Sequence, residues 1–386
     1  MRKIFVAISL MLFVNIFSQT IEKNIIIKDL ATNLPIEGAT VLILKTKQVL
    51  LSNADGKVSF ILKGNSNLQI THTSYFSLQV RSVALTDKEN VVFLKKNVKE
   101  LDELVVTSQH PQKILVGLVK NSIKTLTIPA RLKVYSREFF KLNDAYSYYN
   151  DGLLNFQLEG QTKNFKSTVL VEQNRAFGLI DAGMSEDLVG YNLNNLMENY
   201  YNFKYLTRLL SSSAKKDYDF IVKVYSADNS YYLLQAVPKD NAKGLLDDFE
   251  IVYNPKQKLI IEIKSYLSEK TIWNNKNRFE LGSKKIYKSI YQTVYKFIDG
   301  NYYLISSRET IGFERNYKKE MKKIEVNNYL ITTNFSNNNY SYKESELFRD
   351  KTLYNKANLI LNKYWTTSGL VATDVEQEII NELEER

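Results

Sequence analysis

The chain has no cysteine and only two histidines among its 386 residues. Without thiols it cannot form a disulfide, a thiolate metal site or a cysteine nucleophile. A catalytic zinc needs three protein ligands, commonly histidines together with a carboxylate. His72 is followed by Thr-Ser-Tyr and His110 by Pro-Gln-Lys, so neither begins an H-x-x-E pair. We therefore expect no metal and no metallopeptidase centre, with His72 on a strand surface and His110 in a linker.

Proline and glycine are scarce, with 5 and 14 residues, which argues against a linker-dominated chain. The glycine motifs G-x-x-x-x-G-K-[ST], G-x-G-x-x-G and G-x-S-x-G are absent, so no nucleotide cofactor and no nucleophile elbow are expected. Ser212 and Ser213 do form two S-x-x-K pairs with Lys215 and Lys216, but no K-T-G follows. This pattern favours a helix C-terminus with a basic cap. A hydrolase that uses Ser212 or Ser213 is the weakest of three hypotheses.

Paired carboxylates occur twice. Asp247 and Asp248 precede an apolar run and indicate a loop, while Glu382, Glu384 and Glu385 indicate the solvated face of a terminal helix. No catalytic, cofactor-binding or metal-ligating residue is predicted, and the chain is not expected to be an enzyme.

Aromatic residues are abundant, with 26 Tyr and 19 Phe. These residues favour pleated, half-buried surfaces. With 44% hydrophobic and 24% charged residues, the chain should fold around a core. The composition therefore predicts a mainly β protein.

The N-terminus has the layout of a secretory signal peptide. Met1-Arg2-Lys3 is basic, the run from Ile4 to Phe17 is apolar, and Ser18-Gln19 offers a cleavage site. A membrane-spanning helix would need about 20 apolar residues. We therefore expect a signal peptide at residues 1–18, export to the periplasm or outer membrane, and no transmembrane span after its removal.

The chain is basic, with a net charge of +10 that falls to +8 when Arg2 and Lys3 are removed. Export argues against a nucleic-acid partner, so an envelope protein or an anionic lipid or glycan surface is the expected partner. The alternative is that lysine-rich strands only keep the protein soluble.

Residues 19–106 are expected to form a small β-sandwich, because short strands alternate with turn signals. Gly56 ends a tight turn that begins at Asn53, and glycine can adopt the positive φ needed there. The expected strands are 24–28, 39–44, 49–52, 57–62, 68–73, 78–83 and 91–94.

The stretch from Asp29 to Val41 resembles the D-x-x-T-x-x-P-I-x-G-A-x-V opening of the carboxypeptidase-regulatory-like domain. Asn53 to Phe60 resembles the T-D-x-x-G-x-F hairpin of that family, although Asn53 replaces Thr and one residue is missing before Gly56. The segments 72–75 and 101–107 are similar to the S-x-x-G-Y and L-x-E-V-V-V-T patterns. This resemblance covers about a fifth of the chain and implies a transthyretin-like, seven-stranded sandwich without catalysis.

Residues 107–127 are expected to be a polar linker and a helix over 113–126, which Pro129 ends. Residues 128–386 should form a curved, half-barrel-like antiparallel sheet with two or three helices. The expected strands are 134–142, 145–149, 152–159, 166–173, 220–225, 231–237, 249–253, 259–266, 285–297, 302–313 and 322–335, with a helix over 193–210.

This second region resembles a domain of unknown function of Bacteroidetes-type envelope proteins. The resemblance rests on Tyr135-Ser136-Arg137-Glu138, with Asn143 and Tyr146, and on a C-terminal pattern from Tyr364 to Glu385. The strands 231–266 are also similar in pattern to half-barrel lipoprotein carriers. No active site comes with either resemblance.

Two binding hypotheses remain. The first is an exported binding or scaffold protein of the cell envelope. The second is a periplasmic carrier that holds an acyl chain against Tyr287, Tyr291 and Tyr295, which are expected on one face, with Tyr231 and Leu233 sharing a face of another strand. Plain core packing is the alternative for these side chains. A basic hairpin tip, Arg315 to Lys323, is expected to be an exposed turn or to touch anionic headgroups.

Overall fold

The computed structural model describes residues 20–99, 103–162, 164–180, 192–274, 284–317, 319–338, 341–354 and 356–386. The predicted signal peptide at 1–18 lies outside these residues. The chain separates into two compact units, one of Met1–Lys96 with Lys363–Thr373 and one of Asn97–Asn362 with Asp374–Arg386. It is mainly β, as predicted. The domain boundaries at 106 and 127 remain predictions.

The first unit contains seven strands in two sheets, ordered β4-β1-β7 and β3-β2-β5-β6. Apolar side chains from both sheets form one core, including Ile27, Val41, Phe60 and Ile70. The elements are β1 Thr20–Asp29, β2 Thr40–Ile43, β3 Gln48–Leu51, β4 Lys57–Lys63, β5 Asn67–His72, β6 Tyr75–Arg81, η2 Ser82–Ala84 and β7 Asn90–Leu94.

The tight turn before β4 follows the sequence prediction. The Asn53 side-chain oxygen accepts hydrogen bonds from the backbone N–H groups of Asp55 and Lys57 at 3.0 and 2.9 Å. Gly56 has φ 73°, and a Cβ there would lie 2.4 Å from the Ile27 carbonyl oxygen. Only glycine fits this turn without moving β1.

The first unit also contains a late segment of the chain. Residues Lys363–Thr373, with η6 Tyr364–Thr366, lie along β3. The backbone N–H of Leu51 donates to the Gly369 carbonyl at 2.9 Å. The Gln48 side chain donates to the Thr367 carbonyl at 3.1 Å. The sequence analysis did not anticipate that this segment returns to the first unit.

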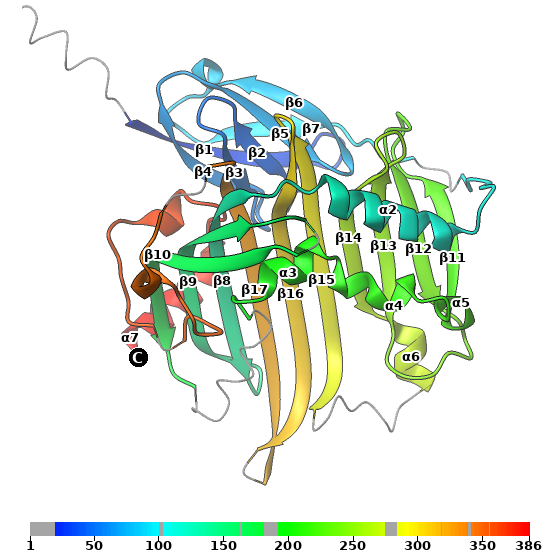
Figure 1. The fold of residues 1–386 in the computed structure, drawn as a ribbon. Helices are drawn as coiled ribbons and strands as arrows, with labels where there is room; N and C mark the ends of the chain where they lie inside the picture. Colours follow the sequence, from blue (N-terminus) through cyan, green and yellow to red (C-terminus); the bar gives the residue numbers. More distant parts are fainter. Residues whose placement is uncertain are drawn as a thin grey trace, which may run out of the picture. The chain divides into compact units, whose positions relative to one another are not determined.

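The second unit is built on a ten-stranded antiparallel sheet, ordered β10-β9-β8-β17-β16-β15-β14-β13-β12-β11 (Figure 1). The sheet is curved, as predicted. Its strands are β8 Ala130–Leu142, β9 Ala145–Glu159, β10 Lys166–Gly178, β11 Tyr218–Val224, β12 Tyr232–Pro238, β13 Asp247–Asn254, β14 Leu259–Leu267, β15 Lys284–Ile298, β16 Asn301–Tyr317 and β17 Glu320–Ser336.

Two hairpin turns of this sheet each contain two consecutive residues with positive φ. Asn143 and Asp144 have φ 50° and 68°, and Asp299 and Gly300 have φ 48° and 81°. Two consecutive positive φ values define the turn type that matches the twist of paired strands. The separate strands expected at 145–149 and 152–159 are wrong, because Gly152 lies inside the continuous strand β9.

Helices cover one face of this sheet, where Figure 1 shows α2, α3 and α4. The helix predicted over 193–210 is wrong as one element, because Phe203 adopts a left-handed conformation with φ 49° and interrupts it. The elements are α2 Pro111–Thr125, α3 Leu196–Tyr201, η4 Lys204–Leu206, α4 Thr207–Leu210, α5 Ala214–Asp217, α6 Glu269–Asn274, η5 Glu344–Glu346 and α7 Asp374–Glu385.

Irregular segments of the chain pair with both outer strands of the large sheet. Val105 donates its backbone N–H to Val222 of β11 at 2.9 Å, and Phe348 donates to Val169 of β10 at 2.8 Å. Covered edges hinder the addition of a strand from another chain. No helix in the described ranges is both long enough and apolar enough to span a bilayer.

Candidate functional site

The serines flagged in the sequence lie in the exposed turn between α4 and α5. The Ser213 hydroxyl is 2.8 Å from the Ser211 hydroxyl. The Lys215 carbonyl accepts a hydrogen bond from the Lys239 ammonium at 2.8 Å. Within the described part of the chain, neither Ser212 nor Ser213 forms a hydrogen bond with a lysine side chain. This segment therefore contains no buried serine–lysine dyad there.

Both histidines have local structural partners. The Nδ1 atom of His72 accepts from the Ser74 backbone N–H at 3.1 Å, at the end of β5. His110 is the N-cap of α2, and its Nδ1 accepts from the Gln112 backbone N–H at 3.2 Å. Burial and nearby lysines lower the pKa of His110, which favours the neutral, accepting ring. The described residues contain no group of three or more His, Cys, Asp or Glu side chains that could hold a metal ion.

The two groups of neighbouring carboxylates seen in the sequence lie in different surroundings. Asp247 and Asp248 are not in a loop as predicted, because they are the first residues of β13. Burial, together with the charge of Asp248, raises the pKa of Asp247 to about 6. Glu382, Glu384 and Glu385 lie exposed on α7, as the sequence indicated.

The aromatic strand residues form core rather than an open groove. Tyr291 stacks on Tyr205 with ring centroids 4.0 Å apart. The fully buried Tyr295 donates its hydroxyl to the Tyr200 carbonyl at 2.9 Å. Helix α3 and the turn after it therefore cover the face that Tyr291 and Tyr295 occupy.

Tyr287 does not share that face. The register slips between Ile286 and Lys288, so Tyr287 is an extra residue that reverses the alternation. A Cβ on Gly312 would lie 2.6 Å from the Tyr287 ring, which covers this glycine on the opposite face. On β12, Leu234 is fully buried and Leu233 is half-buried, as is Tyr231 just before the strand.

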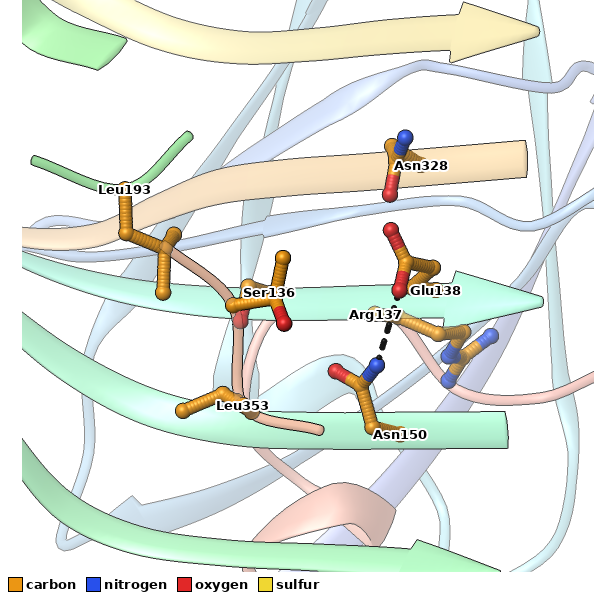
Figure 2. Close-up of a pocket in the computed structure, with 8 residues that line it drawn as sticks. Ser136, Arg137, Glu138, Asn150, Leu193, Asn328 and Leu353 are labelled. Carbon is orange, nitrogen blue, oxygen red and sulfur yellow. Dashed lines mark hydrogen bonds between the residues drawn. The ribbon is translucent and has the colours of Figure 1, made fainter. Parts of the chain in front are cut away.

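A row of buried polar side chains crosses the helix-covered face. Glu138 of β8 pairs with Asn328 of β17, which pairs with Glu309 of β16. Their exposed fractions are 5%, 0% and 8%. Glu138 accepts a hydrogen bond from the Asn150 amide at 3.0 Å (Figure 2). Among the described residues, neither amide atom of Asn328 has a hydrogen-bond partner, and neither does Oε2 of Glu309.

A small cavity adjoins this row. Its volume is about 20 Å³, which is enough for one water molecule and too little for an organic substrate. Two apolar side chains, Leu193 and Leu353, form part of its wall. The full lining is Ser136, Arg137, Glu138, Asn150, Leu193, Asn328, Thr352 and Leu353.

Burial raises the pKa of both Glu138 and Glu309 to about 8, and the charge of Glu309 contributes to the shift at Glu138. Acids with a pKa this close to neutral are typical of general acid–base sites. A general acid must reach the substrate atom that it protonates, and the adjoining cavity leaves no room for one. In the part of the chain that the structure describes, the cavity beside Glu138 is thus too small to admit an organic substrate.

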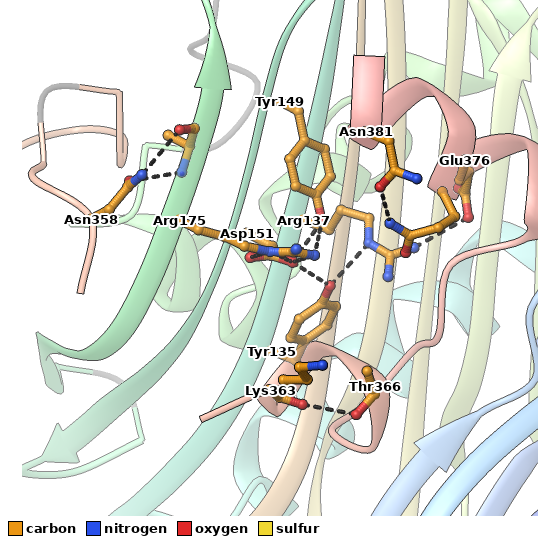
Figure 3. Close-up of polar contacts among 12 residues, drawn as sticks. Tyr135, Arg137, Tyr149, Asp151, Arg175, Asn358, Lys363, Thr366, Glu376 and Asn381 are labelled. Carbon is orange, nitrogen blue, oxygen red and sulfur yellow. Dashed lines mark hydrogen bonds and ion pairs between the residues drawn. The ribbon is translucent and has the colours of Figure 1, made fainter. Parts of the chain in front are cut away.

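The opposite face of the same strands carries a connected ionic network (Figure 3). The guanidinium of Arg175 binds both carboxylate oxygens of Asp151, with Nε–Oδ1 and Nη2–Oδ2 distances of 3.0 Å. The hydroxyls of Tyr149 and Tyr135 donate to Asp151 at 2.6 and 3.0 Å. Burial raises the pKa of Tyr149, which keeps this phenol a donor.

Arg137 extends the network to the C-terminal helix. Its Nε donates to the Tyr135 hydroxyl at 3.0 Å, and its Nη1 lies 3.2 Å from a Glu376 carboxylate oxygen on α7. Two arginines thus balance two carboxylates, and the network holds α7 against the sheet.

A projecting hairpin presents a basic tip. The pairing of β17 with β8 ends at Ile324, and that of β16 with β15 ends at Arg315, so the residues between extend beyond their neighbours (Figure 1). Met321 is 64% exposed there. The Arg315 guanidinium lies 5.3 Å from the centroid of the Tyr317 ring. Tyr317 is partly buried against the core, so Met321 is the exposed apolar side chain of this basic tip. An exposed apolar side chain among cations is typical of interfacial contacts.

No family model and no curated protein matches the sequence. Similar solved structures include lipovitellin, from a study of its lipid–protein interactions, with 11% identity and a TM-score of 0.26 over 62% of this chain and 29% of that chain. A LolA superfamily protein from Nitrosomonas europaea has 10% identity and a TM-score of 0.20 over 61% and 96%. MucB in complex with MucA has 9% identity and a TM-score of 0.16 over 58% and 98%. These TM-scores are too low to bear on function.

Proposed function

We propose that this chain is an exported, non-catalytic protein of a bacterial cell envelope that binds an anionic surface through the tip of the β16–β17 hairpin. The signal-peptide pattern at residues 1–18 supports export, and the net charge of +10 supports an anionic partner. The first unit is proposed to be a carboxypeptidase-regulatory-like domain, in agreement with its seven strands in two sheets.

The observation that carries this proposal is the hairpin tip. Lys319 lies two residues before the exposed Met321 and Lys322 directly after it, and both strands project past their neighbours. A Lys or Arg near an anionic membrane contributes about 1 kcal/mol to binding, and an apolar side chain adds to it by burial. Glu320, which bonds to Lys322, lowers the net charge of the tip but leaves it positive.

Two competing functions have less support. Catalysis would require an accessible reaction centre, and the acids with the most shifted pKa values, Glu138 and Glu309, are enclosed. Transport of an acyl chain would require an open apolar face. In the described ranges, α3 and the following turn cover Tyr291 and Tyr295.

The proposal is tested by co-sedimentation of the full exported chain with lipid vesicles. Vesicles with about a third of anionic phosphatidylglycerol should bind the chain, and purely zwitterionic vesicles should not, with affinity falling as salt rises. The double change Lys319→Glu and Lys322→Glu should weaken binding by at least about tenfold.

The matched control is the double change Lys243→Glu and Lys256→Glu, which reverses two exposed charges elsewhere on the second unit. It should leave most of the binding intact. Equal losses in the two variants would show that only overall charge matters and would refute the assignment to the tip. No binding of the unmodified chain to anionic vesicles would refute binding to a lipid surface.

A further inference from the structure

Strand β7 is an outer edge of the three-stranded sheet of the first unit. Along Asn90–Leu94 it pairs with β1 and, in the described part of the chain, with no other strand. The unpaired backbone N–H and C=O groups of such an edge can pair with a strand from another chain. Natural sheets usually hinder this pairing with a covering segment, charged residues or a bulge.

The other outer strands of the described structure carry these obstacles. Segments of the chain cover β10 and β11, and residues 363–373 lie along β3. The register of β6 slips against β5, and β4 has Lys57 and Lys63 at its ends. Strand β7 has none of these features. Its sequence, Asn-Val-Val-Phe-Leu, contains no charge and no proline, and its pairing with β1 is regular.

The backbone groups of Val91 and Phe93 point away from β1. Successive residues of a strand direct their N–H and C=O groups to opposite sides. The Leu94 carbonyl accepts a hydrogen bond from Leu30, directly after β1, whereas the Lys95 carbonyl accepts one from β6, each at 2.9 Å. Val91 and Phe93 alternate in step with Lys95, so their N–H and C=O groups lie on the open side of β7.

The side chains at these positions are apolar and exposed. Val91 and Phe93 are 47% and 43% exposed and lie on the outer face of the sheet, whereas Val92 between them is buried in the core. Phe76 of β6 is also exposed and lies beside the end of β7, because its N–H bonds to the Lys95 carbonyl. A strand added to β7 would therefore gain both main-chain hydrogen bonds and apolar contacts.

Cationic side chains flank this edge. Lys88 precedes β7 and Lys95–Lys96 follow it, all exposed and none in an ion pair with a described residue. Of the two acids before the strand, Asp87 already pairs with Lys23 at 2.6 Å, which leaves Glu89. The excess of positive charge favours an acidic partner, whereas a second copy of this chain would bring like charges together.

We propose that β7 is the docking edge for an extended, acidic segment of a partner protein, which adds to the sheet as a fourth strand. The backbone groups of Val91 and Phe93 pair with this segment, and its apolar side chains contact the same two residues. Acidic residues at its ends meet Lys88 and Lys95. Strand addition of this kind takes its affinity from main-chain hydrogen bonds. The site does not depend on the proposed binding of the β16–β17 tip to an anionic surface.

The test measures binding of a fluorescent, capped peptide to the full exported chain by fluorescence anisotropy. The peptide alternates valine with threonine and has two acidic residues at each end. We expect a dissociation constant below about 1 mM that rises with salt. The same peptide with lysines at its ends should bind at least about tenfold more weakly.

N-methylated peptides test the main-chain pairing without changing the protein. In an added strand, the residues opposite Val91 and Phe93 share their face and direct their N–H groups to β7. The valines of the peptide should occupy these positions, where they contact the two apolar side chains. N-methylation of the valines should therefore abolish binding, and N-methylation of the threonines should preserve it.

Two proline variants locate the site. Val91→Pro removes an N–H that faces away from β1, a position at which an edge strand accepts proline, and should weaken binding at least about tenfold. Ile61→Pro makes the matched change at an exposed residue of β4, the opposite edge of the same sheet, and should bind like the unmodified chain. The double change Lys319→Glu and Lys322→Glu at the hairpin tip should also leave peptide binding intact.

Three results would overturn the proposal. The first is no binding of the acidic peptide up to about 1 mM, and the second is equal binding of the two N-methylated peptides. The third is equal binding by Val91→Pro and Ile61→Pro when circular dichroism shows both to be folded. A dimer of the unmodified chain that Val91→Pro abolishes would assign the edge to a second copy and would also overturn it.

Discussion

At the scale of single residues, the buried carboxyl of Asp247 should make stability depend on pH. Its pKa is raised to about 6 in the fold, above the ordinary value of 3.8. Folding then favours the protonated form. The stability that this group contributes is complete below about pH 4 and is lost as the pH rises through 6.

An asparagine side chain at position 247 cannot ionise, so the Asp247→Asn variant should not lose stability as the pH rises through 6. Between pH 4 and pH 7 the unmodified chain should lose up to about 3 kcal/mol relative to the variant, measured by urea unfolding. Parallel pH profiles for the two proteins would contradict the assigned pKa.

Two glycines of the first unit offer a matched comparison. Gly56 and Gly38 have φ values of 73° and 74°, but only at Gly56 would a Cβ meet a backbone atom, the Ile27 carbonyl oxygen. Gly38→Ala should cost about 1 kcal/mol from the left-handed conformation alone. Gly56→Ala should cost at least about 2 kcal/mol more, because β1 must move. Equal unfolding free energies for the two variants would contradict this account.

The sequence predicted the turn at Gly56 but not the buried polar residues. Tyr135-Ser136-Arg137-Glu138 stood out only through a resemblance, and charged strand residues are usually read as solvent-facing. Strand alternation sends Arg137 and Glu138 to opposite faces, yet both faces are covered. The covering residues Leu353 and Glu376 come from more than 200 positions later in the chain, so no local pattern could indicate their burial.

At the scale of secondary-structure elements, the ionic network should contribute to the attachment of β10 and α7. Asp151→Asn would leave Arg175 without its bidentate partner in a buried site. Breaking such a pair by removing one partner costs about 3–5 kcal/mol. Urea unfolding of this variant should therefore show a loss of that size.

The control is Asp144→Asn, which removes the exposed pair between Asp144 and Lys323. Asparagine suits the positive φ of 68° at this turn, so the change should cost less than about 1 kcal/mol. If Asp151→Asn were no more costly than Asp144→Asn, the network would not stabilise the fold.

Strands were easier to predict than helices for a physical reason. Alternating apolar residues and turn signals identify a strand locally, and all seven strands of the first unit were predicted to within a few residues. The interruption at Phe203 depends on tertiary packing, since its ring lies 5.0 Å from that of Tyr295. Tyr287 lies on the opposite face because of a β-bulge. The regular spacing of the tyrosines in the sequence gives no sign of this bulge.

At the scale of the whole molecule, the described part of the second unit leaves neither the outer strands nor the aromatic face of its sheet open to a ligand. Both outer strands pair with segments of their own chain, and α3 covers the aromatic face. The aromatic face of the sheet is thus occupied by the protein's own residues in the part that the structure describes. The proposed binding is placed at the outer surface, at the tip of the β16–β17 hairpin.

The central claim is that the β16–β17 tip contacts the anionic surface. The most direct measurement places a photo-crosslinking amino acid at Met321 and, as a control, at Val375 of α7, which is 66% exposed. After irradiation with phosphatidylglycerol vesicles, position 321 should become attached to lipid and position 375 should not. Equal labelling at both positions, or none at 321, would contradict the account.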